Sequence, residues 1–249
     1  MNIVKTAFAV LLCAVSVQAC AVGGMAELNV YDRSEGRLLP VYWHEGRAWV
    51  VGKPGNEYQV SLRSRQGEDV LAVLSVDGIN VITGETANPR QSGYVLSPGR
   101  VMEVRGWRKN MERTAAFYFT SLPDSYAART GRPDNVGAIG LALFRRKAQE
   151  PAPVAKPDAL SRLERSDSAA RAPASASAEA QLGTGHGRQE ISPARYVGFE
   201  RASSEAAETI TLYYDSYANL VARGVIRAPL PPRRPLPDPF PGFVADPPA

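Results

Sequence analysis

The stretch DVLAVLSVDGINVITGE, residues 69–85, decides the fold class of this 249-residue chain. Two runs rich in β-branched residues flank the dipeptide Asp77-Gly78. Glycine accepts a positive φ without strain and aspartate tolerates it, so this dipeptide favours a two-residue hairpin turn. We therefore expect two antiparallel strands joined at Asp77 and Gly78.

Two neighbouring segments repeat this pattern. Glu45-Gly46 divides the apolar stretch LLPVYWHEGRAWVVG, and Pro98-Gly99 divides GYVLSPGRVMEVRGW. A turn dipeptide between two apolar runs is typical of a hairpin. We expect a hairpin at each of the two positions.

Strand patterns continue through residues 22–147, the predicted body of the protein. Apolar and polar residues alternate in EYQVSLRS, which indicates a strand with one buried face. About eight or nine short strands at this spacing favour an all-β fold, an antiparallel β-sandwich, over the alternative of a barrel. Within the connection PDSYAARTGRPDN, the sequence allows one helical turn at residues 125–129.

The composition changes after residue 147. Residues 148–190 are rich in Ala, Pro and Ser and end in LGTGHG, which predicts a flexible linker that ends in a glycine-rich loop. Aromatic and β-branched residues return in ARYVGFERA and in the two expected strands on either side of YDS, within residues 191–228. So short a segment seldom forms its own core, so we expect these C-terminal strands to complete the body. Residues 229–249 form a proline-rich tail, read as a strap on the protein's own surface rather than a ligand for an aromatic groove.

The N-terminus predicts export. One lysine, Lys5, precedes an apolar run that ends at Val17, which is too short to span a membrane and fits a signal peptide over residues 1–19. The stretch VQAC resembles a lipobox, so Cys20 is a candidate for lipidation, with ordinary secretion as the alternative. We expect a periplasmic or outer-envelope protein with no transmembrane segment after signal cleavage.

Few residues offer catalytic or metal chemistry. The second cysteine, Cys13, leaves with the signal, so neither a disulfide nor a CxxC metal site can form. LGTGHG lacks the Lys-Ser/Thr pair and the flanking strand and helix of a phosphate loop, and its histidine, His186, has no GxSxG nucleophile to serve. His44, the other histidine, is expected at a hairpin rim. We therefore predict no catalytic residue, no cofactor and no metal.

The alternative function is that of a hydrolase that uses carboxylates in turns. Glycosidases need only two acids at a set separation, and several carboxylates lie in expected turns. A hydrolase of envelope polysaccharide would draw its pair from Asp77, Glu85, Asp124 and Asp134.

Two segments suggest a binding rim. GRVMEVRGWRKNMER places basic residues, Arg113 among them, around a tryptophan expected to be exposed, and SYAARTGRPDNVG is a long connection where binding groups often lie. The candidate rim residues are Arg105, Trp107, Arg108, Lys109, Tyr126, Arg129 and Arg132. The net charge of +4 is too small to indicate a nucleic-acid partner. An envelope protein, a polysaccharide or an anionic lipid surface is the expected partner.

Several blocks resemble an uncharacterised, exported family of proteobacterial proteins with no assigned function. The blocks are VLSVDGINVITGETA, QSGYVLSPG, GWRK, AAFYFTSLPDSYAARTGRPDNVGAIGLALF and LGTGHGRQE. The resemblance implies that LGTGHG and the C-terminal strands form one unit with the body, and it assigns no catalytic residues. We expect an exported envelope protein that acts as a non-enzymatic binding or assembly module.

Overall fold

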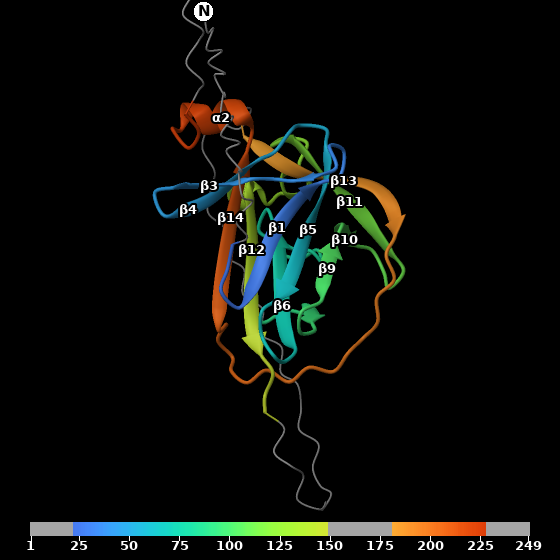
Figure 1. Cartoon of the computed structure of the whole chain (residues 1–249). Helices are drawn as coiled ribbons and strands as arrows, with labels where there is room; N and C mark the ends of the chain where they lie inside the picture. The colour runs from blue at the N-terminus through green and yellow to red at the C-terminus, as the bar shows by residue number, and fades with distance from the viewer. Residues whose placement is uncertain (1–21, 149–180, 228–249) are drawn as a thin grey trace, which may run out of the picture.

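Two β-sheets pack face to face in the computed structural model, which describes residues 22–148 and 181–227 (Figure 1). The predicted β-sandwich is thus confirmed. The predicted signal peptide, Cys20, residues 149–180 of the predicted linker and the proline-rich tail lie outside the described residues. No helix in the described ranges is long and apolar enough to cross a membrane.

The first sheet, called sheet A here, runs in the order β10-β11-β5-β1-β2, with β13 paired to β11 and β9 paired to β5. Its strands are β1 (Ala26–Asp32), β2 (Arg37–Leu38), β5 (Glu57–Ser64), β9 (Val101–Val104), β10 (Gly106–Arg108), β11 (Arg113–Ser121) and β13 (Leu182–Ile191). Buried and half-buried residues alternate along β1, as expected for a strand with one face on the core.

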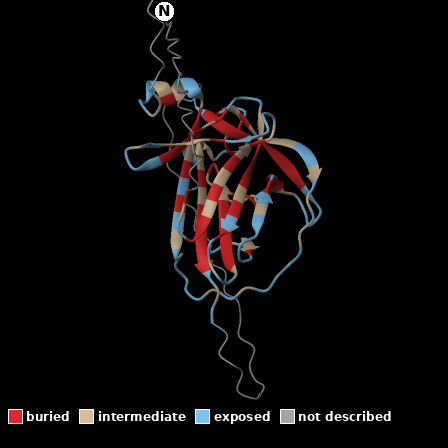
Figure 2. Ribbon diagram, in the orientation of Figure 1, coloured by how far each residue is buried: buried red, intermediate tan, exposed pale blue. Residues whose placement is uncertain are grey.

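The second sheet, called sheet B, runs in the order β3-β4-β14-β12-β6-β7, with β8 paired to β6. Its strands are β3 (Val41–His44), β4 (Arg47–Val51), β6 (Val70–Val76), β7 (Ile79–Asn80), β8 (Tyr94–Leu96), β12 (Ala138–Arg145) and β14 (Glu208–Asp215). Two short helices, α1 (Tyr126–Arg129) and the 3-10 helix Pro133–Asn135, lie between β11 and β12, and a third, α2 (Tyr217–Ala222), follows β14. Buried residues gather between the sheets (Figure 2).

Two of the three predicted hairpins are confirmed. Asp77 and Gly78 join β6 to β7 with φ angles of 52° and 72°. Glu45 and Gly46 join β3 to β4 in the same left-handed conformation. The third prediction is wrong, because the turn at Pro98-Gly99 leads from β8 in sheet B to β9 in sheet A, and these strands pair with β6 and β5 instead of with each other.

The predicted glycine-rich loop is a ten-residue strand, β13, which pairs along β11. Its glycines alternate along the strand because neighbouring atoms fill the space that a side chain would need. A Cβ at Gly183 would lie 2.6 Å from the Cβ of Ser125, and a Cβ at Gly185 would lie 2.2 Å from Cζ of Tyr118. The glycines thus serve close packing and not chain reversal.

Residues 191–228, predicted to complete the body, contribute one long strand, β14, to sheet B. β14 lies inside sheet B, parallel to β4 and antiparallel to β12. The second predicted strand after YDS is instead helix α2, because Ser216 caps it by accepting a hydrogen bond from the backbone N–H of Asn219 at 3.3 Å.

The stretch ARYVGFERA is part of a crossover, residues 192–207, that leads from β13 to β14 around the outside of the sandwich (orange in Figure 1). Apart from one bridge between Arg201 and Arg146, no ladder forms there. Its Phe199 packs on the outer face of sheet B, beside Phe144 and Leu71. Arg146 and Arg201 stack on these rings, with guanidinium carbons 4.6 Å and 4.2 Å from the centroids of Phe199 and Phe144.

A chain of residues 22–148 alone should fail to unfold cooperatively, because it lacks β14 from the middle of sheet B and β13 from the side of β11. Adding residues 181–227 as a separate peptide should restore a cooperative thermal transition, measured by circular dichroism. A truncated chain that is monomeric and as stable as the full chain would contradict the observed strand order.

The substitution Gly183→Ala should lower the free energy of unfolding by about 1–3 kcal/mol, because the new methyl group overlaps Ser125. Gly198→Ala is the matched control, since a Cβ added at that position would meet nothing within 4 Å. That control should change stability by less than about 0.5 kcal/mol. Urea denaturation measures both, and equal effects would show that β13 does not need its glycines.

Candidate functional site

The four candidate carboxylates occupy different settings. Asp77 is 1% exposed and both its oxygens are engaged: Oδ1 accepts from the N–H of Gly137 at 3.0 Å and Oδ2 from the N–H of Thr184 at 2.8 Å. Glu85 is exposed and accepts from Gln91 at 3.1 Å. Asp124 and Asp134 are also exposed. Asp124 accepts a hydrogen bond from Ser121, and Asp134 lies in the 3-10 helix.

Asp77 anchors a buried polar network between the sheets. The hydroxyl of Tyr214 donates to Oδ1 of Asp77 at 2.5 Å and lies 2.7 Å from Oγ1 of Thr184, which lies 2.6 Å from the hydroxyl of Tyr58. Because the proton of Tyr214 goes to Asp77, Thr184 donates to Tyr214 and accepts from Tyr58. Each of these three hydroxyl groups therefore donates its proton to a partner in the network.

Burial sets the protonation of this network. It raises the pKa of Asp77 from 3.8 to about 6, although the hydrogen bonds from Tyr214, Thr184 and Gly137 favour the charged form. Burial, together with the negative charge of Asp77, raises the pKa of both Tyr58 and Tyr214 well above the ordinary value. Asp77 thus has a structural role as an acceptor that joins distant segments.

Several members of the predicted rim are engaged within the fold. Trp107 is 3% exposed, so the expected exposure is wrong: its indole N–H donates to the carbonyl of Gly185 at 3.4 Å and its ring meets Phe117 edge-on. The guanidinium of Arg108 donates to the carbonyl of Ser192 at 2.5 Å, which fastens the crossover to β10.

Two more rim arginines have partners of their own. Arg105 forms an ion pair of 2.7 Å with Glu103. Arg132 donates to the carbonyl of Gly84 at 3.1 Å and to Thr130 at 3.0 Å. These two side chains are therefore less available to a ligand than the sequence suggested.

The remaining rim residues come together around His186. The ring of Tyr126 in α1 lies 4.9 Å from Trp107 and 5.5 Å from His186, centroid to centroid. Burial lowers the pKa of His186, and the positive charges of Lys109 and Arg129 lower it further. The two predicted rim segments therefore meet, and β13 contributes a histidine to them.

Strand register places further residues on the same surface. Residues paired across a ladder have side chains on the same side of the sheet. Phe117 pairs with His186, Ala115 with Gln189, and Arg113 with Ile191; Lys109 lies opposite Arg113, because its N–H donates to the Arg113 carbonyl at 3.0 Å. On this side of sheet A, Ala115 and Phe117 face the core, whereas the residues toward the end of the ladder, such as Arg113 and Ile191, are exposed to solvent.

We call this surface the basic shelf: Lys109, Arg113, Tyr126, Arg129, His186, Gln189 and Ile191. Its Lys109, Arg113 and Arg129 are exposed and form no ion pair within residues 22–148 and 181–227. Sequence reasoning named the three cations and Tyr126 but set His186 aside. The period-two spacing of glycines in LGTGHG was the available signal, because it indicates a strand with one crowded face.

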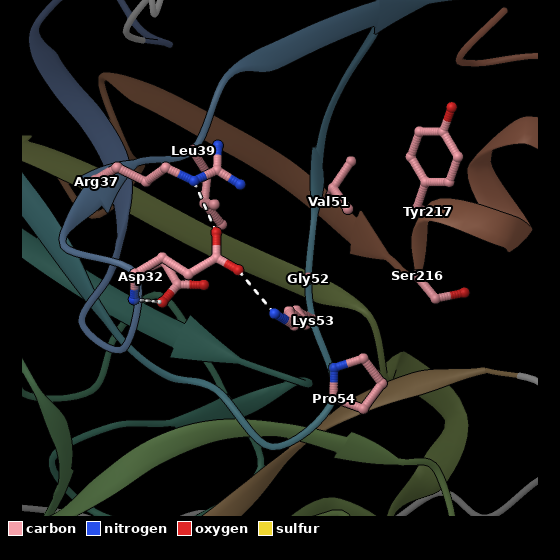
Figure 3. Close-up of a pocket in the computed structure, with 10 residues that line it drawn as sticks. Asp32, Arg37, Leu39, Val51, Gly52, Lys53, Pro54, Ser216 and Tyr217 are labelled. Atoms are coloured by element: carbon pink, nitrogen blue, oxygen red, sulfur yellow. Dashed lines mark hydrogen bonds and ion pairs between the residues drawn. The ribbon is translucent and has the colours of Figure 1, made fainter. Parts of the chain in front are cut away.

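A separate pocket of about 210 Å³ opens between the β1–β2 region and the start of α2 (Figure 3). Its two cations, Arg37 and Lys53, are balanced by two carboxylates, Asp32 and Glu35. Glu35 accepts hydrogen bonds from Arg37 at 2.8 Å and from Lys53 at 3.0 Å, and these bonds lower the pKa of Glu35. Ser216 and Tyr217 lie across the opening from Arg37. This pocket offers less unpaired charge than the basic shelf.

Comparisons with known proteins find no matching family, no matching curated protein and no matching solved structure. Within the described residues, no three His, Cys, Asp or Glu side chains gather so that they could hold a metal ion.

The raised pKa of Asp77 predicts how the stability of the fold depends on pH. Folded Asp77 takes up its proton near pH 6 and the unfolded residue near 3.8, so the folded state binds more protons between these values. The stability contributed by Asp77 therefore rises as the pH falls from about 6 to about 4, by at most about 3 kcal/mol.

Asp77→Asn removes this titration and keeps a residue that tolerates the positive φ. Chemical denaturation of both proteins from pH 4 to pH 7 should show the native chain gaining stability over the variant on acidification. A difference that is constant, or that shrinks as the pH falls, would contradict the raised pKa.

Proposed function

We propose that this protein is a non-enzymatic binding module of the cell envelope that holds an anionic ligand on the basic shelf. The observation that carries the proposal is the convergence of Lys109, Arg129 and His186 from three separate segments, with no acid paired to either cation in the described chain. The envelope location rests on the predicted signal peptide, residues 1–19.

The residue types of the shelf suit an anion. Arginine binds phosphate or carboxylate through two parallel N–H groups, and lysine adds a compact positive charge. Gln189 and Tyr126 supply neutral hydrogen-bonding groups beside these cations. Because the cations are exposed, salt should weaken the binding.

The same residue types support binding rather than bond cleavage. The shelf combines cations, one imidazole, an amide, a phenol and an aliphatic side chain, and it contains no carboxylate. Asp77, the buried member of the four candidate acids, has both of its oxygens engaged. We therefore favour a binding module over the hydrolase alternative.

Inorganic phosphate is the first probe, and the C2 proton of His186 is the reporter. Phosphate should raise the pKa of His186 in NMR titrations, because an anion beside the ring stabilises its charged form. Replacing Lys109 and Arg129 by glutamine should raise that pKa without phosphate, since two repelling charges are lost, and should weaken the response to phosphate.

Two controls accompany this experiment. The His44 resonance is an internal reference, because His44 lies in the β3–β4 hairpin outside the shelf. The double variant Arg90→Gln/Arg100→Gln removes two exposed cations outside the shelf. If phosphate shifts both histidines equally, or if the control variant weakens the response as much, anion binding at the shelf is ruled out.

A further inference from the structure

We infer that the anion held by the basic shelf is the phosphate of a membrane lipid headgroup, so that the exposed end of sheet A, at the β10–β11 turn and the end of β13, docks on an anionic membrane surface. This inference rests on the proposed function and names its partner. It is carried by exposed apolar side chains that adjoin the cations.

Three large apolar residues near the shelf are left in solvent. Ile191 is 82% exposed, Tyr196 is 90% exposed and Val197 is 49% exposed. Ile191 lies in the same row as Lys109 and Arg113, on the same side of the sheet. The end of β13 and the start of the crossover are accordingly among the exposed parts in Figure 2.

The chain that carries Tyr196 and Val197 is anchored on both sides. Before them, the N–H of Ser192 donates to the carbonyl of Glu112 at 2.7 Å, and the N–H of Ala194 donates to the carbonyl of Met111 at 2.7 Å. After them, Phe199 is held under Arg146. The apolar residues are therefore presented next to the β10–β11 turn.

The charge of this surface complements an anionic membrane. Arg195 is exposed beside Tyr196 and adds to the positive charge of Lys109 and Arg113, while Glu112 removes one charge. Glu190 is turned to the opposite side of the sheet, where it pairs with Arg33 at 2.8 Å and Arg188 at 2.6 Å. The surface keeps a net positive charge next to its apolar residues.

A lipid layer satisfies both parts of this surface at once. Basic residues contact lipid phosphates, while tyrosine and branched aliphatic side chains favour the boundary between headgroups and acyl chains. A soluble anion or a charged polysaccharide would engage the cations alone and leave Ile191 and Tyr196 in water. The combination therefore selects a membrane lipid over other anions.

Vesicle sedimentation tests the inference with residues 22–249, which contain every described residue and lack the signal and Cys20. The protein should bind phosphatidylcholine vesicles that contain about one third phosphatidylglycerol, and should bind pure phosphatidylcholine far less. Lys109→Gln/Arg113→Gln should weaken binding about 25-fold, at about fivefold for each charge. Ile191→Ser/Tyr196→Ser should weaken it at least about tenfold.

Matched variants separate this surface from the rest of the chain. Val101→Ser/Tyr217→Ser removes two exposed apolar residues from β9 and α2, and Arg90→Gln/Arg100→Gln removes two cations outside the shelf. Neither should change vesicle binding by more than about twofold. Circular dichroism of each variant confirms that it is folded.

The outcomes distinguish the two proposals. If phosphate or dextran sulfate binds at the shelf and anionic vesicles do not, the proposed function stands and the lipid inference is overturned. If vesicles bind and Ile191→Ser/Tyr196→Ser binds as tightly as the native chain, the apolar contact is overturned. If none of these anions binds, both proposals fail.

Discussion

The carboxylate of Asp77 is the contact on which the rest of the structure depends. It lies in the tight turn between β6 and β7. It accepts hydrogen bonds from Gly137, just before β12, from Thr184 in β13 and from Tyr214 in β14. One side chain thus connects the body to both C-terminal strands, across both sheets. A buried acceptor left without these donors would cost about 1–3 kcal/mol for each unsatisfied group, so the turn and the strands require each other.

This network also positions the basic shelf. Thr184, whose N–H and hydroxyl are both engaged, is two residues before His186 on the same side of β13. On the opposite side of that strand, Gly183 allows close contact with Ser125, whose hydroxyl caps α1 by accepting from Ala128 at 3.1 Å. The strand that carries His186 and the helix that carries Tyr126 and Arg129 are therefore held against each other by buried contacts. The shelf is thus built from segments far apart in sequence.

Local signals predicted the parts of this fold that local chemistry determines. Asp77-Gly78 and Glu45-Gly46 are turns because both positions need a positive φ, and the helical turn at residues 125–129 follows from a serine cap. The failures share another cause. Pro98-Gly99 has turn chemistry, yet its two strands find partners in different sheets, and the strand in LGTGHG depends on β11, more than 60 residues earlier. For the same reason Lys109 and Arg129 were recognisable as candidates, whereas the place of His186 and Ile191 beside them needed the register of β13.

The crossover, residues 192–207, covers one apolar surface and leaves another exposed, and this difference is relevant to the role of the shelf. On the outer face of sheet B it lays Phe199 and Ala206 over Leu71, Val73 and Phe144, and arginines cover the rings. A few residues earlier, the same fastened segment leaves Tyr196 and Val197 in water next to Ile191. The crossover therefore covers the apolar residues on the outer face of sheet B and leaves those beside the shelf exposed. Exposed apolar residues that are held in place beside unpaired cations fit a surface that is completed by a partner, and the proposed lipid partner supplies the missing negative charge and apolar contact together.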